Sequence, residues 1–371
     1  MGPSIIFDKS AIQSLGQQSI YEVSRYFHTV YPPVLLYEIL ADLALIKDDP
    51  DASKKKVAEL ANKVMPSDSI TNIHYQPICI HNLLGIKINM DRRPLVGGAR
   101  EVISKDGKKG NFIPVQPENE AVLRWRAGEI TQADRDFAVR WRQTIQSFDL
   151  EGTKKNLPKP PMRIRSLEDL KMFVDNMLAE QDSQIRLLDL FLVYLQCKPY
   201  IRDWIHHRWS VNDYVSINEF APYAFHCLRV QMLFCIGMSH GILGTKPTNA
   251  VDVEYLYYTP FAYIFCSGDK LHEQLAPLVL KEDQSFVKRD TMHQALKELV
   301  EERKESSQAE PNEQSLIKEL WIKHWGRFVP QTTTEPVSAE RSKKILEELK
   351  PMMEAIQEES NKASPQPRFP V

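Results

Sequence analysis

Residues 251–280 constrain the fold more than any other part of the chain, because they indicate a helix, a buried strand and a second helix in close succession. Asp252 lies where the first helix should begin, and residues 263–266 form an apolar run typical of a buried strand. Residues 267–270, Ser-Gly-Asp-Lys, should open the next helix. Strand exits in open α/β sheets are places where ligands bind, so we expect functional residues here.

The composition is that of a globular protein. Of 371 residues, 43% are hydrophobic, and the length indicates two or more structural units. Lys and Arg total 47 against 49 Asp and Glu, so the net charge of -2 argues against coating nucleic acid by bulk charge but is compatible with a local basic groove. The five irregularly spaced cysteines suit reduced thiols. We expect a cytoplasmic protein with neither a signal peptide nor a membrane span.

The N-terminal segment indicates a second strand that ends in a carboxylate. Residues 4–7 are apolar, Asp8 follows them, and residues 9–16 are typical of a short helix that ends at a glycine. If Asp8 and Asp269 act together, the strands before them should be parallel neighbours, because only then do the two carboxylates meet at one sheet edge.

A nearly apolar helix should follow at residues 34–46, where Glu38 and Asp42 are the only charges. Such a helix is expected to be buried, and acids four residues apart share one of its faces. A buried carboxylate needs a partner such as a cation or a metal ion. Glu38 therefore has either a salt bridge or a functional role.

Helical spacing and its breaks predict most of the remaining chain. Further helices are expected at residues 54–65, 119–148, 285–304, 316–328 and 338–360, with three or four within 167–239. Residues 69–161 have a weak pattern, and residues 154–165 are typical of a solvated, proline-rich tether. Residues 363–371 should be disordered. The middle part of the chain is predicted to shape substrate access and to carry much of the binding surface, through Arg92, Arg93, Arg100, Lys105, Lys108 and Lys109.

Taken singly, the acids have structural explanations. Asp is a favoured N-cap and suits the positive end of the helix dipole, which accounts for Asp8, Asp252 and Asp269 one at a time. Taken together, their order resembles that of the PIN-domain nucleases, a family that includes the ribonuclease toxins of bacterial toxin–antitoxin pairs. The pattern is an acid and a serine after the first strand, a helix-borne Glu about thirty residues later, and a late Asp-helix-strand-Ser-x-Asp-Lys unit. The matching residues are Asp8, Ser10, Glu38, Asp252, Ser267, Asp269 and Lys270.

The resemblance covers residues 4–65 and 248–288, less than a third of the chain. It implies a PIN-like α/β fold, with a parallel sheet flanked by helices and its acids gathered at the carboxyl edge. About 180 residues separate the two parts, so the resemblance also implies a mainly helical insertion and a helical C-terminal extension. The implied division is a core in 1–69 and 248–300, an insertion in 70–247, an extension in 301–362 and a tail in 363–371.

The same resemblance implies a function. Asp8, Glu38, Asp252 and Asp269 would be both the catalytic residues and the ligands of Mg²⁺ or Mn²⁺. Substrate would be bound by Ser10, Ser267 and Lys270. Glu254 is an alternative to Asp252, although it would point about 200° around the helix.

The chemistry is coherent without the family. Converging carboxylates repel one another, and hard divalent cations with oxygen ligands relieve that repulsion. Such ions activate water for attack on a phosphodiester. The expected function is a metal-dependent endoribonuclease, with RNA favoured over DNA by the resemblance, and with a regulatory protein or a second copy of the chain as further partners. The alternatives are an inactive PIN-like scaffold that binds nucleic acid or protein, and a metal-dependent DNA nuclease or phosphatase.

Other motifs are weaker. A zinc site could draw on His226, Cys227, Cys235 and His240, but the apolar helix that carries most of them favours core packing. His272 has no paired ligand in the sequence. Residues 241–246, Gly-x-x-Gly-Thr-Lys, resemble a phosphate-binding loop only superficially, because the spacing of a P-loop is absent.

Overall fold

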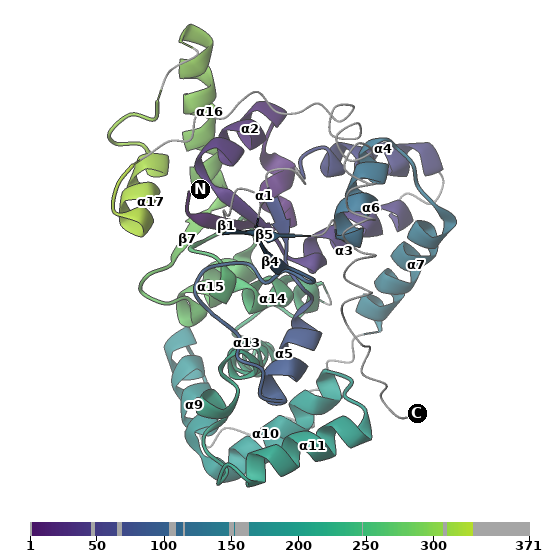
Figure 1. Ribbon diagram of the computed structural model, residues 1–371, viewed down its shortest axis with the longest axis vertical. Coiled ribbons are helices and arrows are strands. Elements are labelled where there is room, and N and C mark those ends of the chain that lie inside the picture. Colours follow the sequence, from purple (N-terminus) through teal and green to yellow (C-terminus); the bar gives the residue numbers. More distant parts are fainter. Residues whose placement is uncertain are drawn as a thin grey trace.

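A five-stranded parallel sheet lies at the centre of the molecule and is flanked by helices (Figure 1). The computed structural model describes residues 2–45, 49–64, 69–103, 109–113, 116–147, 152, 163–246, 248–306 and 310–328. The strand order is β3-β2-β1-β6-β7. The strands are β1 (Ser4–Phe7), β2 (His28–Tyr31), β3 (Ser69–Thr71), β6 (Ile264–Ser267) and β7 (Ser285–Lys288). Both ends of the chain therefore build one sheet.

The two strands that precede Asp8 and Asp269 are parallel neighbours, as predicted. In their register Phe7 lies opposite Cys266, and the Asp8 N–H donates a hydrogen bond to the Cys266 carbonyl at 3.1 Å. Both strands lie inside the sheet and are buried along their whole length, which is why they are apolar rather than alternating. Their carboxyl ends therefore meet at the same sheet edge.

The helices nearest to the sheet come from the two ends of the chain. On the N-terminal side they are α1 (Lys9–Ser14), α2 (Gln17–Tyr26), α3 (Pro33–Ala41) with the 3₁₀ turn η1 (Asp42–Ala44), and α4 (Pro50–Ala61). On the C-terminal side they are α14 (Asn249–Tyr257) with the 3₁₀ turn η2 (Thr259–Phe261), α15 (Lys270–Val279), α16 (Arg289–Glu305) and α17 (Leu316–Trp325). The predicted helix starts near Asp252 and at Lys270 are both present.

The middle of the chain is mainly helical and forms two separate groups (Figure 1). After α5 (Tyr75–Leu83), an antiparallel hairpin of β4 (Arg100–Ile103) and β5 (Lys109–Phe112) leads to α6 (Pro117–Arg126) and α7 (Gln132–Gln146). These two helices pack on α4 and α3. The second group is α9 (Leu167–Ala179), α10 (Gln181–Tyr194), α11 (Pro199–Ser210), α12 (Ile217–Phe220) and α13 (Pro222–Ser239).

Two expectations need correction. The helix expected at residues 285–304 starts later, because its first four residues are β7, which pairs with β6 from Ile264↔Ser285 to Ser267↔Lys288. The single helical run expected at 119–148 is two helices, because Thr131 and Asp134 form a capping box that starts α7 anew. Strand β3 also crosses the boundary drawn at residues 69 and 70. Residues 338–360, 363–371 and most of 154–165 lie outside the described part of the chain.

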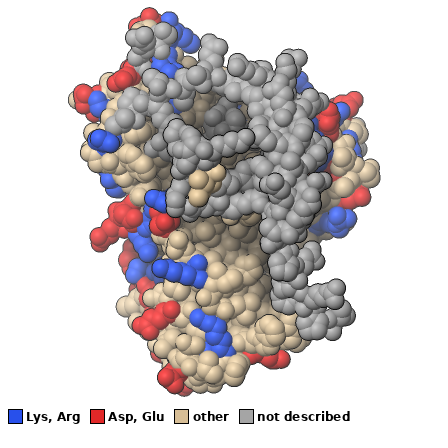
Figure 2. All heavy atoms as spheres, viewed as in Figure 1, with Lys and Arg blue, Asp and Glu red and all other residues tan. Residues whose placement is uncertain are grey.

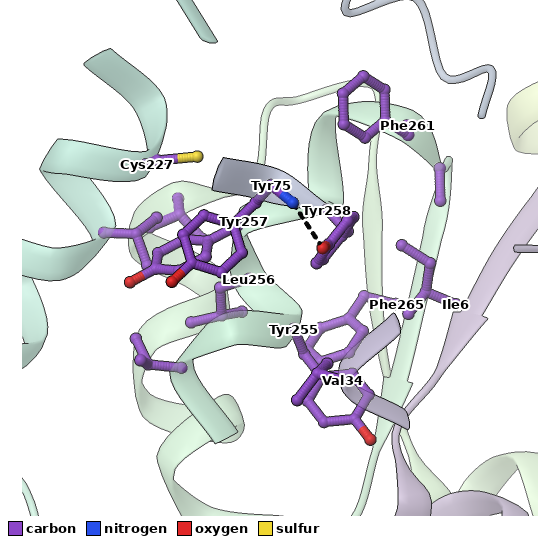
Figure 3. Packing of buried hydrophobic residues seen from close by; sticks show 14 of the residues in the cluster. Ile6, Val34, Tyr75, Cys227, Tyr255, Leu256, Tyr257, Tyr258, Phe261 and Phe265 are labelled. Carbon is purple, nitrogen blue, oxygen red and sulfur yellow. Dashed lines mark hydrogen bonds between the residues drawn. The ribbon is translucent and has the colours of Figure 1, made fainter. Parts of the chain in front are cut away.

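Helix α14 joins the sheet to the second helical group (Figure 3). Tyr255 lies against Phe265 of β6 on one side of this helix. On the other side the Tyr257 ring lies 4.7 Å from that of Tyr75, and the Tyr258 hydroxyl accepts a hydrogen bond from the Tyr75 N–H at 2.9 Å. All three tyrosines of this segment are buried, so the short helix is fixed on both sides and can hold Asp252 rigidly.

The described surface in Figure 2 shows no large patch of one charge that would indicate a function. On the face in Figure 2, basic and acidic side chains are interspersed, and much of the described surface between them is uncharged. None of the helices within the described ranges is long and apolar enough to cross a membrane.

Candidate active site

Asp8 is buried at the exit of β1, with 4% of its surface exposed, and three neighbouring groups donate hydrogen bonds to it. Its carboxylate accepts hydrogen bonds from the Ser10 hydroxyl at 2.9 and 3.0 Å, from the Ala11 N–H at 2.8 Å and from the Ser267 hydroxyl at 2.6 Å. The bond from Ala11 is the helix cap that the sequence allowed. The hydrogen bond from Ser267 is not part of the helix cap. Ser267 lies on the neighbouring strand β6, so its hydroxyl holds the Asp8 carboxylate in position from the adjacent strand.

His272 supplies a buried positive charge at this edge, and the sequence did not reveal it. Its Nε2 lies 2.6 Å from the Asp252 carbonyl, which can only accept, so Nε2 carries a proton. The Ser267 hydroxyl gives its one proton to Asp8, so Nδ1, 2.7 Å from that hydroxyl, must donate to it. With both nitrogens protonated, the imidazole is a cation, and its Nδ1 lies 3.5 Å from the Asp8 carboxylate.

The pKa shifts of this pair agree with the hydrogen-bond count. Burial alone would lower the pKa of His272, but the hydrogen bond and charge of Asp8 and the charge of Asp252 raise it to about 9. Burial likewise opposes ionisation of Asp8, yet His272 and the Ser267 hydroxyl outweigh burial, so the pKa of Asp8 is lowered. The two residues form a buried ion pair.

Glu38 is half-buried on α3, among the apolar neighbours that the sequence gives it. Its carboxylate accepts a hydrogen bond of 2.5 Å from the Tyr255 hydroxyl. Burial raises the pKa of Glu38, while the charge of Lys9 and the bond from Tyr255 act against the rise. Asp42, four residues on, has a different environment: it is fully buried and forms ion pairs with Lys9 at 2.8 Å and Lys56 at 3.1 Å. Asp42 is therefore a structural anchor, since its charge is already compensated.

Asp252 is the acid most influenced by the others. Burial raises its pKa to about 7, the charge of His272 acts against this rise, and the charges of Asp269, Glu38 and Asp8 add to it. No hydrogen bond reaches its carboxylate within the described ranges. Asp252 is thus within electrostatic reach of the other three predicted acids, although they come from the end of β1, from α3 and from the start of α15.

Glu254 has a different environment from Asp252, two residues earlier. Burial raises its pKa to about 8, and Glu38 is the only acid whose charge contributes to the rise. The charge of Glu254 in turn raises the pKa values of the tyrosines Tyr37, Tyr75, Tyr194, Tyr257 and Tyr258. The charge of Glu254 therefore acts mainly on tyrosines of α3, α5, α10 and the end of α14, whereas Asp252 is influenced by the other acids.

Asp269 caps α15 and borders a cleft. Its Oδ1 accepts a hydrogen bond from the Leu271 N–H at 2.6 Å, and its own N–H donates to Ser267 at 2.9 Å. Asp252, Asp269 and Lys270 line the same cleft of about 390 Å³. Ser10, the other predicted helper, accepts a hydrogen bond from the Gly268 N–H at 3.1 Å, so it ties α1 to the loop that precedes Asp269.

Arg92 is not part of a basic binding surface. It is 6% exposed, its guanidinium bonds to both carboxylate oxygens of Asp283 at 2.7 and 3.1 Å, and a further bond reaches the Pro260 carbonyl. Arg93 beside it is exposed. The side chains of Arg100, Lys105, Lys108 and Lys109 lie outside what the structure describes.

The zinc alternative is not supported by the geometry. His226 Nε2 lies 3.0 Å from the Leu256 carbonyl, and His240 Nδ1 lies 3.0 Å from the Ile236 carbonyl. Within the described residues, no three His, Cys, Asp or Glu side chains lie together in a ready-made metal site, and this includes the four acids in their present positions.

No family model, curated protein or solved structure matches this chain.

Proposed function

We propose that this protein is a metal-dependent phosphodiesterase of the PIN-like type, with a helical insertion, and that RNA is its favoured substrate. The observation that supports it most is the electrostatic coupling of Asp252 to three other acids at the edge where β1 and β6 end. Like charges repel one another, so a group of four acids, two of which line a cleft, is typical of a functional site.

The donor groups suit Mg²⁺ or Mn²⁺. Asp8, Glu38, Asp252 and Asp269 provide only oxygen ligands, which hard divalent cations prefer. The Asp252 carboxylate accepts no hydrogen bond from the described chain, and the one bond to the Asp269 carboxylate uses Oδ1. When bound, such an ion lowers the pKa of a coordinated water and stabilises charge on the scissile phosphate.

The chain's own residues have separable tasks in this proposal. His272 and Ser267 keep Asp8 ionised and oriented, and Tyr255 orients Glu38. Lys270 is exposed and lines the cleft, where it can bind a phosphate of the substrate. Ser10 and Ser267 are engaged with Asp8, so they support the acid and contact substrate only through it.

The test combines cleavage with metal binding. Labelled RNA and DNA of one sequence are incubated with the protein in Mn²⁺ or in EDTA, and we expect Mn²⁺-dependent cleavage, with RNA cut faster. Asp269→Asn keeps the size and most of the capping ability of Asp269. Without metal it should be at least as heat-stable as wild type, because like charges repel less. The rise in Tm caused by Mn²⁺ should be smaller, since binding to the folded state weakens.

Two results would overturn the proposal. An identical metal-induced rise in Tm for wild type and Asp269→Asn would mean that Asp269 is only a helix cap. Binding of RNA or of a protein without cleavage in any divalent ion would favour the inactive scaffold. A cytoplasmic location and a regulatory protein or second copy as partner remain part of the proposal, to be examined by fractionation and by size in solution.

A further inference from the structure

The cleft that Asp252 and Asp269 line has a second wall, whose residues have no role in the proposed metal site. It is formed by the loop at residues 241–246, between α13 and α14, and faces the start of α15. With about 390 Å³, the cleft falls in the range of small-ligand sites, about 300–1,000 Å³. We propose, resting on the function above, that this cleft binds the phosphate next to the scissile one on the substrate strand, through Lys246 and Lys270.

Hydrogen bonds from neighbouring residues hold the loop in place, so this wall of the cleft has a fixed position. The Ile242 and Leu243 N–H groups both donate to the Gly237 carbonyl, at 2.9 and 3.1 Å. A buried Asn249 side chain donates to the Gly244 carbonyl at 2.7 Å. Gly241 has φ +72°, a conformation that side chains rarely adopt, so glycine is required at the turn that ends α13.

The last three residues of the loop have backbone N–H groups that are free to donate hydrogen bonds. The N–H groups of Gly244, Thr245 and Lys246 make no hydrogen bond within the described chain. Lys246 and Lys270 are exposed, both line the cleft, and neither forms an ion pair with any described residue. Two unpaired lysines on one cleft, beside a loop that has free N–H groups, form a site for an anion.

The position of these donors next to the acids decides which anion fits. Asp252 and Asp269 lie on the same cleft as the two lysines, so an isolated anion would be both attracted and repelled there. A polynucleotide resolves this conflict, because its successive phosphates can place one at the acids, where a cation neutralises them, and the next at the lysines. The lysines therefore bind a flanking phosphate rather than the scissile one.

The test measures binding without cleavage. A fluorescein-labelled RNA oligonucleotide is titrated at several salt concentrations in Ca²⁺, an oxygen-ligated ion that neutralises the acids, under conditions where a gel shows no cleavage. Anisotropy is the readout, for wild type and for Lys246→Ala combined with Lys270→Ala. The matched control is Lys297→Ala with Lys304→Ala, two exposed lysines on α16 that do not line the cleft. We expect weaker binding by the first pair only. Its slope of log K against log salt should become shallower by about 0.7 for each phosphate that the protein no longer neutralises.

Each outcome bears on a separate claim. The rise in Tm caused by Mn²⁺ should be the same in the double variant as in wild type, because lysines do not bind the ion. If wild type binds and cleaves RNA but the double variant keeps its affinity and salt slope, the inference is wrong and the proposed function stands. If wild type neither binds nor cleaves, both fail. Should the double variant unfold, Lys246→Gln and Lys270→Gln are compared singly by the same criteria.

Discussion

Asp8 and His272 share one hydroxyl group: Ser267 Oγ lies 2.6 Å from the Asp8 carboxylate and 2.7 Å from His272 Nδ1. The other ring nitrogen of His272 bonds to the Asp252 carbonyl. One buried side chain on α15 therefore connects β1, β6 and α14, the three elements that carry or precede most of the acids. Its positive charge compensates the acids in the metal-free protein, and its hydrogen bonds set their positions.

We expect His272→Gln to weaken metal binding more than it weakens the fold. Glutamine can keep one hydrogen bond but not the charge, so Asp8 loses both its ion pair and its alignment. Partners of metal ligands typically change affinity by about 10–100-fold when replaced. The measurement is the rise in Tm with Mn²⁺ over a titration. The control is His240→Gln, since the hydrogen bonds of His240 within the described residues are to Ile236 and Ser239 of α13. Equal titration curves for wild type and His272→Gln would contradict this role.

Asp252→Asn and Glu254→Gln separate the two candidate ligands on α14. Asp252 is coupled to three acids and Glu254 to one, so only Asp252→Asn should reduce the Mn²⁺-induced rise in Tm. Both substitutions should raise the Tm of the metal-free protein at pH 8, because each removes a carboxylate whose ionisation is opposed by burial. A reduced metal response in Glu254→Gln instead would make Glu254 the ligand.

The sequence predicted the parts of the site that lie on regular elements. Residues 4–7 and 263–266 are apolar because both strands are buried on two sides, and Asp8 and Asp269 follow them because parallel strands end at one edge. Glu38 was accessible to prediction as well, since a lone acid in an apolar helix must have a partner inside the fold.

The supporting residues could not be predicted in this way. His272 is three residues after Asp269 and looks like an ordinary residue in the first turn of a helix, and only the packing of α15 against α14 brings it to the Asp252 carbonyl. The ion pair of Lys9 could not be predicted for the same reason, because its partner Asp42 is 33 residues away in the sequence. Strand β7 was predicted to be helical because it has only two apolar residues and the sequence around it is strongly charged. Its pairing with β6 is a tertiary contact, which local sequence does not indicate.

Arg92 was predicted to bind substrate, and the structure indicates another role. Arg92→Ala should destabilise the fold by about 1–3 kcal/mol, because the Asp283 carboxylate loses two hydrogen bonds and the Pro260 carbonyl loses one. Arg92→Gly should be less harmful than alanine by about 1 kcal/mol, since residue 92 has φ +67°. Urea unfolding measures both. The exposed Arg93→Ala is the control and should be near wild type. If Arg92→Ala kept full stability but lost RNA affinity, the binding-surface prediction would be right after all.

The stability of the metal-free protein should fall as pH rises from 6.5 to about 9, because His272 has a raised pKa over this window. A raised pKa stabilises the fold below the unfolded value of 6.5, and that contribution is lost as pH passes about 9. Asp252 and Glu254 act in the same direction, since their pKa values are raised to about 7 and about 8.

Other groups have lowered pKa values, and they change the stability of the fold at a lower pH. His74, His226 and His324 have pKa values lowered from 6.5 to about 4, mainly by burial, so their contribution to stability is complete above pH 6.5 and is lost only on acidification. The measurement is Tm in EDTA across the alkaline window. Glu254→Gln should show a smaller fall, because one of the three groups is gone, and Mn²⁺ should reduce the fall in wild type, since the ion favours ionised acids. A Tm that stays constant or rises from pH 6.5 to 9 in EDTA would contradict the buried cation at His272 and the raised pKa values of Asp252 and Glu254.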